Sequence, residues 1–178
     1  MSIFNSIISL FTSKRLAQIE RFKTNPVAVQ RETLADLVRK AGDTEYGKLY
    51  GFDSIWTREQ YRERLPVIQY DEVAPYSERM MKGEQNLLWP TPVTWFAKSS
   101  GTTAARSKFI PVSEEILKGS QFQGGKDVIA IFNHLYPDSP VFKGKTLALG
   151  GSSEVRKDNN NCRYGDLSAI MISNTPFW

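Results

Sequence analysis

The sequence predicts an α/β fold, with a helical N-terminal region followed by a part that contains both strands and helices. Two patterns carry this prediction. Apolar residues recur at helical spacing over roughly the first 90 residues, whereas β-branched and aromatic residues gather in short runs from LLWPTPVTWF onward. The chain has 178 residues, of which 40% are hydrophobic, so its size suits one domain or one large lobe of a bigger unit with a substantial core.

Two long helices are expected at the N-terminus. In the first, Leu16 and Ile19 continue the apolar spacing of the opening MSIFNSIISLF, and the helix is expected to stop near Asn25. Pro26 suits the first turn of the second helix, because proline lacks the N–H that this position leaves unpaired. The second helix places four apolar residues on one face and ends before Gly42: Leu34, Leu37, Val38 and Ala41.

The next segment, GDTEYGKLYGF, is rich in glycine and tyrosine, and a loop is expected there. Thr57 and Gln60 have the spacing of a capping box, which opens a short helix that ends at Leu65, before a proline. Asp71 is a candidate cap for the helix that follows.

Strands are expected at 93–97 and 108–112, where β-branched and aromatic residues dominate. Ser113, followed by two glutamates, indicates the start of a long helix that reaches about Leu135. A short buried strand is expected at 146–149. The polar stretch SSEVRKDNNNCRYGD is expected to be an exposed loop, and a hydrophobic pattern resumes after it.

Composition excludes several classes of function. The net charge of +4 is mild, and the lysines and arginines are spread along the chain, which argues against nucleic-acid binding. With one cysteine, Cys162, and one histidine, His134, the chain has no internal disulfide and no metal site of the multi-His or multi-Cys kind. A Cys–His nucleophilic pair requires these two residues to meet. The simpler expectation is a buried or half-buried Cys162 and a His134 on a helix.

The N-terminus carries no targeting signal of the usual kinds. Its apolar residues are interrupted by polar ones, no small-residue cleavage site follows, and no run approaches the ~18 apolar residues of a membrane span. Together with the single cysteine, this predicts a cytoplasmic protein that does not bind membranes.

A run of small and hydroxyl-bearing residues lies between the two expected strands: Ser99, Ser100, Gly101, Thr102 and Thr103. Glycine lets backbone N–H groups approach a phosphate closely, hydroxyls add donors, and Arg106 and Lys108 supply positive charge. The run matches neither the Walker A pattern nor G-x-G-x-x-G. From these residues alone, a plain hairpin turn and a phosphate-binding loop both remain open.

The wider stretch WFAKSSGTTAARSKFIPVSEE resembles the phosphate-binding loop of the adenylate-forming enzymes. Within that superfamily the chain is most similar to the auxin-responsive acyl-acid amido synthetase family, and to its bacterial members in particular. The resemblance runs from about Gln30 to the last residue, and further stretches carry it: TEYGKLYGF, LPVIQYDEV, RMMKGEQNLLWP, GGKD, GKTLALGGSS and YGDLSAI.

The resemblance implies an ATP-dependent ligase that adenylates a small carboxylic acid and then joins it to an amino acid, with ATP and Mg²⁺ required. It implies that residues 99–103 hold the ATP phosphates and that Lys108 is the basic residue closing the loop. It assigns no catalytic residue and no metal ligand in this chain. Ala104 and Ala105 depart from the superfamily pattern, in which a glycine is common, and this change is expected to stiffen the loop.

Members of that family are much longer than this chain. We therefore expect residues 1–178 to be the N-terminal portion of the large ATP-binding domain, without the C-terminal lid domain and inactive alone. In that portion, 1–90 is expected to be mainly helical, and 91–178 to be mixed α/β with the phosphate loop. The alternatives are a non-catalytic remnant that binds a nucleotide or a partner, and a structural fragment that does not fold alone.

Overall fold

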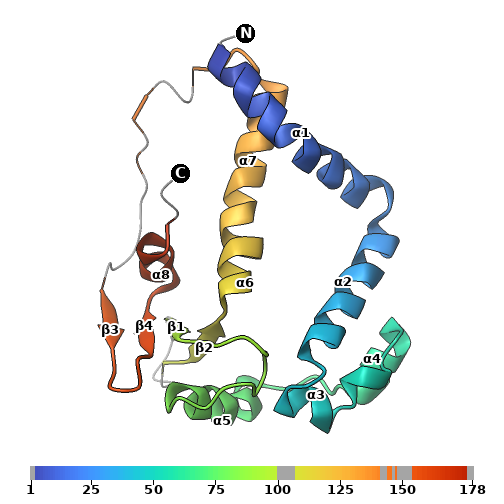
Figure 1. The fold of residues 1–178 in the computed structure, drawn as a ribbon, viewed down its shortest axis with the longest axis vertical. Coiled ribbons are helices and arrows are strands. Elements are labelled where there is room, and N and C mark those ends of the chain that lie inside the picture. The colour runs from blue at the N-terminus through green and yellow to red at the C-terminus, as the bar shows by residue number, and fades with distance from the viewer. Residues whose placement is uncertain (1–2, 100–106, 141–143, 146, 148–153, 176–178) are drawn as a thin grey trace. The chain divides into compact units, whose positions relative to one another are not determined.

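The computed structural model describes residues 3–99, 107–140, 144, 145, 147 and 154–175, with side chains from residue 12 onward (Figure 1). It confirms the predicted α/β class. The described helices are α1 (Ile3–Thr24), α2 (Pro26–Ala41), α3 (Glu45–Leu49), η1 (Phe52–Ser54), α4 (Arg58–Arg64), α5 (Tyr70–Met81), α6 (Glu114–Ile116), the π-helical turn η2 (Leu117–Gln121), α7 (Phe122–Leu135) and α8 (Leu167–Ser173). The strands are β1 (Trp95–Lys98), β2 (Phe109–Val112), β3 (Val155–Lys157) and β4 (Arg163–Gly165).

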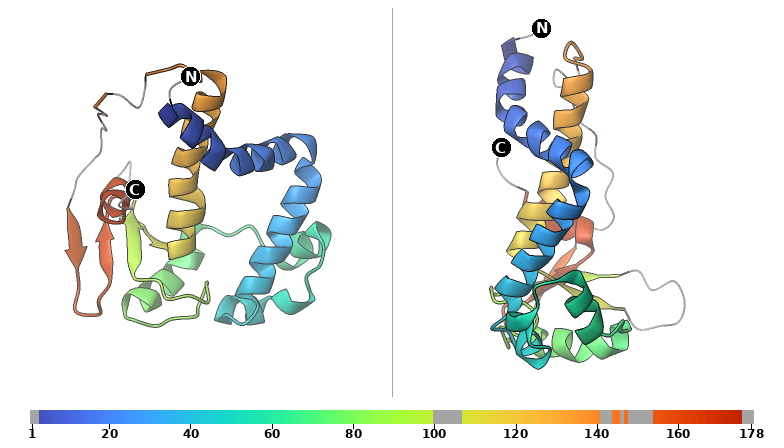
Figure 2. Two further views of the ribbon diagram at one scale, coloured as in Figure 1. Left: turned by 45° about the horizontal axis from the view of Figure 1, so that its top comes forward. Right: turned by 90° about the vertical axis from the view of Figure 1, so that its right-hand side faces the viewer.

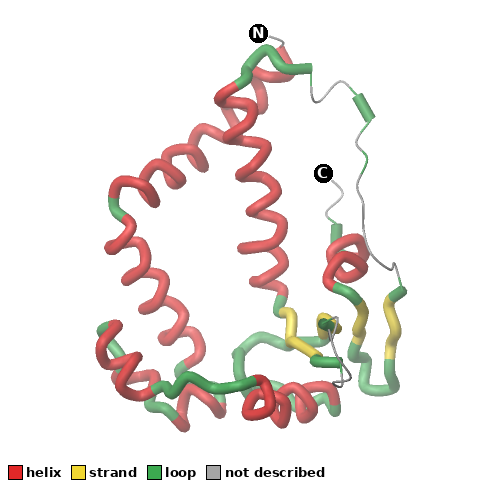
Figure 3. The backbone as a smooth tube through the Cα atoms, turned by 180° about the vertical axis from the view of Figure 1, so that it is seen from behind, coloured by secondary structure: helices red, strands yellow, loops and turns green. Residues whose placement is uncertain are grey.

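Helices and loops make up the described chain up to residue 81, and the strands belong to later residues (Figure 3). In the described part of the chain, no helix has the length and apolar character needed to cross a membrane. Contacts divide the chain into two units. Unit 1 comprises residues 1–30 and 118–149, and unit 2 comprises residues 31–117 and 150–178.

Unit 1 is built on the contact between α1 and α7. A two-pronged ion pair joins the helices: Arg15 donates from Nε to Asp127 Oδ1 at 2.7 Å and from Nη2 to Asp127 Oδ2 at 2.6 Å. Gln123 donates a further hydrogen bond to the same carboxylate at 2.8 Å. The hydrogen bond from Arg15, aided by that from Gln123, holds the pKa of Asp127 below its ordinary value.

Asp127→Asn is expected to lower the free energy of unfolding at pH 7 by about 1 kcal/mol, because the pair is mostly buried but still screened by solvent. Since the pKa of Asp127 is lower in the folded state, its contribution is full above the unfolded value of about 3.9 and is lost as the pH falls through the folded pKa. Urea unfolding at pH 7 and pH 3 measures both effects. Asp36→Asn, at an exposed ion pair on α2, serves as the control and is expected to cost less. Equal losses for the two variants would contradict the prediction.

The N-terminal caps of the helices of unit 2 confirm one prediction and correct two. Thr57 caps α4 and forms the predicted capping box with Gln60. The segment expected to be a loop instead contains α3 and the first residue of η1. The Thr44 hydroxyl accepts a hydrogen bond from Gly47 N–H at 2.9 Å and so starts α3. Asp71 does not cap α5: the helix begins at Tyr70, and its N-cap is Gln69, two residues before Asp71.

The sheet of unit 2 has the strand order β2-β1-β4-β3. β1 pairs with β2 in antiparallel and with β4 in parallel, while β3 and β4 form an antiparallel hairpin. This hairpin overturns the prediction that 152–166 is an exposed loop. Helix α8 lies beside β1 and β4 (Figure 2), and α5 packs against β2.

The core of unit 2 has two clusters of buried side chains. The first surrounds Phe96 of β1, which is fully buried, and also contains Met80, Leu87, Val93 and Cys162. The second contains Val38, Ala41, Phe52 and Ile55. Leu37, predicted on the same face of α2 as Val38, is instead 47% exposed.

As predicted, α1 ends at Thr24, and α2 begins at Pro26. Both strands that flank the loop are present, each shifted by one or two residues. Ser113 caps the following helix, which continues through η2 into α7 and passes through both glycines of GGKD without ending. The strand expected at 146–149 lies largely outside the described residues.

Candidate functional site

Strands β1 and β2 bring together the two ends of the predicted phosphate-binding loop. Their register places Lys98 opposite Phe109, and the Ser99 N–H donates to the Lys108 carbonyl at 2.9 Å. The chain therefore leaves β1 and enters β2 at neighbouring positions of the sheet, and a backbone hydrogen bond joins the two ends of the loop. The remaining predicted site residues lie outside the described residues: Ser100, Gly101, Thr102 and Thr103, together with Ala104, Ala105 and Arg106.

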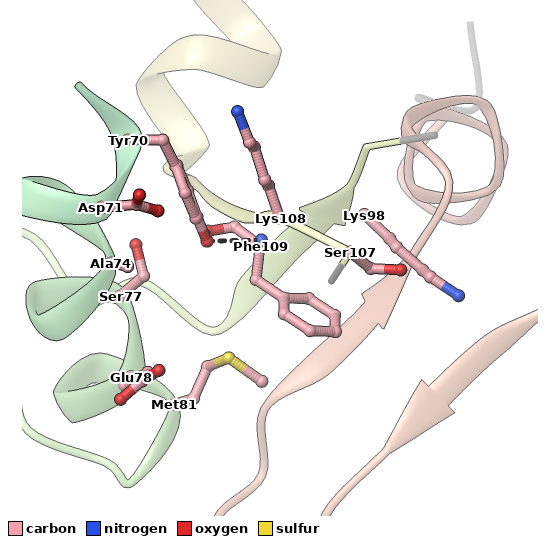
Figure 4. Close-up of a pocket in the computed structure, with 10 residues that line it drawn as sticks. All are labelled: Tyr70, Asp71, Ala74, Ser77, Glu78, Met81, Lys98, Ser107, Lys108 and Phe109. Carbon is pink, nitrogen blue, oxygen red and sulfur yellow. Dashed lines mark hydrogen bonds between the residues drawn. The ribbon is translucent and has the colours of Figure 1, made fainter. Parts of the chain in front are cut away.

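A pocket of about 720 Å³ lies between α5 and the two ends of the loop (Figure 4). Helix α5 presents one face to it, because positions three or four residues apart project from the same side of a helix. The loop ends supply the opposite wall. The lining residues are Tyr70, Asp71, Ala74, Ser77, Glu78, Met81, Lys98, Ser107, Lys108 and Phe109.

The pocket carries charges of both signs on opposite walls. Lys98 and Lys108 come from the loop ends, whereas Asp71 and Glu78 come from α5. Among the described residues, no ion pair joins either lysine to a carboxylate. Neither ammonium group is therefore neutralised by a described carboxylate, although the Lys98 ammonium is directed away from α5 (Figure 4).

Two hydroxyl-bearing side chains of α5 also line the pocket. Ser77 is 1% exposed, and its hydroxyl has no hydrogen-bond partner among the described residues. Tyr70 lies at the start of the helix, and its hydroxyl accepts a hydrogen bond from the Phe109 N–H at 2.8 Å. A buried polar group without a partner is uncommon in proteins, so the Ser77 hydroxyl is a candidate donor to a ligand.

A second pocket, of about 220 Å³, lies at the carboxyl ends of the parallel strands β1 and β4. It shares Lys98 and Phe109 with the first pocket and is also lined by Gly165 and Asp166. Asp166 is the N-cap residue of α8, but its side chain makes no capping hydrogen bond. This edge of a sheet is where α/β folds commonly bind ligands.

The single cysteine and histidine contribute no reactive site to unit 2. Cys162 is 1% exposed in the core, and burial raises the pKa of its thiol, so the thiolate is disfavoured. His134 lies on α7, in unit 1. The described residues contain no group of three or more side chains suited to holding a metal ion.

The sequence pattern predicted the ends of the loop but not the opposite wall of the pocket. Tyr70, Ser77 and Glu78 lie about 20 to 30 positions before the loop, and no local pattern links residues at that separation. The stretch LPVIQYDEV, which contains Tyr70, was the only signal available.

Comparison with known proteins identifies the family. The sequence model that describes the GH3 family N-terminal domain matches residues 15–178 of this chain. The chain is 33% identical over 109 residues to indole-3-acetic acid-amido synthetase GH3.2 of Arabidopsis thaliana, which covers 61% of this chain and 20% of that protein. It is 26% identical over 165 residues to jasmonoyl--L-amino acid synthetase JAR6 of Nicotiana attenuata, which covers 92% of this chain and 28% of that protein.

The fold is also found in a solved structure, that of GH3.15 acyl acid amido synthetase. The two match with a TM-score of 0.75 at 22% identity, over 90% of this chain and 28% of the longer one. The chain therefore spans between a fifth and somewhat more than a quarter of the length of these proteins. Since the family model matches nearly all of its residues, this chain belongs to the GH3 family, within the family's N-terminal domain.

Proposed function

We propose that this chain binds the phosphates of ATP at the loop between β1 and β2, as the N-terminal portion of an ATP-dependent acyl-acid amido synthetase. The observation that carries the proposal is the base of the loop. The hydrogen bond between Ser99 and Lys108 closes it, and two lysines that pair with no described carboxylate flank it at an open pocket. The relatives, named for amide synthesis with indole-3-acetic acid or with jasmonate, support the same reaction class.

In the proposed reaction, the carboxylate of the acid attacks the α-phosphorus of ATP, and the bond to pyrophosphate breaks. The amine of an amino acid then attacks the carbonyl of the acyl-adenylate, which releases AMP and forms the amide. This chemistry depends on positioning and on stabilisation of phosphate charge. Residues 99–103 would donate hydrogen bonds to the phosphates, and Lys108 would offset their charge as pyrophosphate leaves.

Mg²⁺ would enter the site bound to ATP. Magnesium in nucleotide sites commonly takes one or two carboxylates from the protein and its other ligands from phosphates and water. Asp71 and Glu78, on the wall opposite the lysines, are suited to that limited role. A mixed-charge pocket of this kind fits a metal–polyphosphate complex better than a bare anion.

We propose that residues 1–178 form a portion of a large ATP-binding domain, with the phosphate loop in residues 91–178, and that the protein acts in the cytoplasm. We expect the chain alone to bind ATP without forming the amide, because the relatives that are named for this activity are several times longer. Thermal unfolding with and without Mg-ATP tests the binding, since a ligand that binds only the folded state raises its stability. No shift at millimolar Mg-ATP would contradict the proposal.

Lys108→Met is expected to weaken Mg-ATP binding about tenfold, because a hydrogen bond from a charged donor to phosphate is lost. Isothermal titration calorimetry measures the dissociation constant. Lys48→Met, on α3 and exposed, removes the same charge outside the pocket and serves as the matched control. The assignment of Lys108 fails if both variants bind Mg-ATP as tightly as the wild type.

A further inference from the structure

We infer that Tyr70 is a positioning residue for the proposed phosphate site: it holds the backbone where the loop re-enters the sheet, and it holds the Lys108 ammonium beside the pocket. The inference rests on the proposed function of the loop. Tyr70 comes from α5, 39 residues before Phe109 in the sequence, and it lines the same pocket as the loop ends (Figure 4).

The first part of the inference rests on hydrogen bonds to an edge strand. In an antiparallel pair, successive residues direct their N–H and C=O groups alternately toward the partner strand and away from it. The Lys108 carbonyl bonds to Ser99, so the N–H and C=O of Phe109 face outward. Because β2 is at the edge of the described sheet, no other strand among the described residues satisfies those two groups.

The Tyr70 hydroxyl satisfies both outward groups of Phe109. It accepts a hydrogen bond from the Phe109 N–H at 2.8 Å and donates one to the Phe109 carbonyl at 3.3 Å. One side chain therefore replaces a missing strand at the residue that immediately follows Lys108. Without it, the end of β2 would be free to fray, and the base of the loop would lose its fixed position.

The second part of the inference rests on the aromatic ring. The Lys108 Nζ lies 5.2 Å from the centroid of the Tyr70 ring, within the range of a cation–π contact. Lysine has a long, flexible side chain, so such a contact restricts where the charge can lie before a ligand arrives. The ring thus reduces the entropy that Lys108 loses when it binds phosphate.

Tyr70 is itself placed by the helix and not by the loop. It is the first residue of α5, and the Gln69 N–H donates to the Glu72 carboxylate at 2.8 Å, which fixes the first turn. Helix α5 in turn packs against β2. A side chain on a rigid element positions a site more accurately than one on a loop does.

Two substitutions separate the contributions of Tyr70. Tyr70→Phe removes the hydroxyl and keeps the ring, whereas Tyr70→Leu removes both. We expect Tyr70→Phe to weaken Mg-ATP binding about threefold to tenfold, measured by calorimetry, and Tyr70→Leu to weaken it further. Tyr76→Phe removes a hydroxyl from the same helix outside the pocket, and it is expected to leave the dissociation constant unchanged.

A double-mutant cycle with Lys108→Met distinguishes positioning from a general structural role. If the ring acts through Lys108, the extra loss of Tyr70→Leu over Tyr70→Phe disappears when Lys108 is already methionine. A merely structural tyrosine would instead lower the melting temperature and leave the Mg-ATP dissociation constant unchanged. That result would overturn the inference.

Amide hydrogen exchange provides a readout that needs no nucleotide. The Phe109 amide is expected to be protected in the wild type and to exchange at least tenfold faster in Tyr70→Phe, because its acceptor is gone. An unprotected Phe109 amide in the wild type would contradict the inference. If the wild type binds neither Mg-ATP nor inorganic tripolyphosphate, the proposed function and the inference fall together. If it binds and both Tyr70 variants bind equally well, only the inference falls.

Discussion

Replacing Phe96 with alanine is expected to lower the free energy of unfolding by about 3–5 kcal/mol. Phe96 is fully buried in β1, and it packs against Met80, Leu87 and Val93. Removing the ring loses the transfer free energy of its carbons and leaves a cavity that the surrounding sheet cannot fill. β1 also carries one end of the proposed phosphate-binding loop, so the proposed site depends on this core.

Chemical unfolding in urea measures the loss, and the exposed Ile110 on β2 offers a control. Ile110→Ala, at 49% exposure, is expected to cost much less than Phe96→Ala, because its side chain already contacts water. Saturating Mg-ATP is expected to recover part of the stability of Phe96→Ala, since binding favours the folded state. A change below about 1 kcal/mol for Phe96→Ala would contradict the burial on which the prediction depends.

Three local signals in the sequence predicted the N-terminus of a helix correctly. Thr57 with Gln60, and Ser113 ahead of two glutamates, act through hydrogen bonds within four residues, and both caps are present in the structure. Pro26 begins α2 for a similarly local reason, since its fixed φ suits a first helical turn. Such features are encoded in a short window and need no knowledge of the tertiary fold.

The hairpin of β3 and β4 was missed because its stability comes from distant residues. Its sequence is polar and contains an asparagine run, which favours a loop. β4 is a strand because it pairs in parallel with β1, with Trp95 opposite Arg163. Cys162 adds a buried anchor beside Phe96, 66 residues earlier in the sequence (162 − 96). A pairing at that separation leaves no periodic trace.

The sequence likewise predicted part of the candidate site, namely the residues of the loop, and not the residues of α5. Ser99 was identified because it opens a recognisable run of small residues, and Lys108 because it supplies positive charge after that run; the structure joins the two by a hydrogen bond. Tyr70 was not identified, since its role depends on the unpaired edge of β2. Its neighbour Asp71 was expected to cap the helix, and it lines the pocket instead.

The segment GDTEYGKLYGF shows how the same residue type can serve a different purpose from the one predicted. Its glycines favoured a loop, yet Gly47 lies inside helix α3 and is buried. Ala41 is the last residue of α2, and a Cβ atom on Gly47 would lie 2.0 Å from its carbonyl oxygen. Gly47 is therefore required for the close approach of two helices.

Gly47→Ala is expected to lower the free energy of unfolding by about 3 kcal/mol, because the added methyl group meets backbone that has little freedom to move. The N-terminus of α3 is held by hydrogen bonds from Glu45 N–H to the Asn86 carbonyl at 3.0 Å and from Tyr46 N–H to the Leu87 carbonyl at 2.9 Å. The Thr44 hydroxyl also donates to the Ala41 carbonyl at 2.6 Å, which fixes the oxygen that the methyl group would strike.

Gly124→Ala is the matched control, since it makes the same change in a helix where a Cβ atom would meet nothing within 4 Å. Alanine has the higher helix propensity, so that variant is expected to be more stable than the wild type by up to about 1 kcal/mol. We therefore expect urea unfolding to show that the same glycine-to-alanine change lowers the free energy of unfolding at position 47 and raises it at position 124. If Gly47→Ala were also stabilising, α2 and α3 would not approach each other as closely as the structure shows. The glycine would then have no packing role.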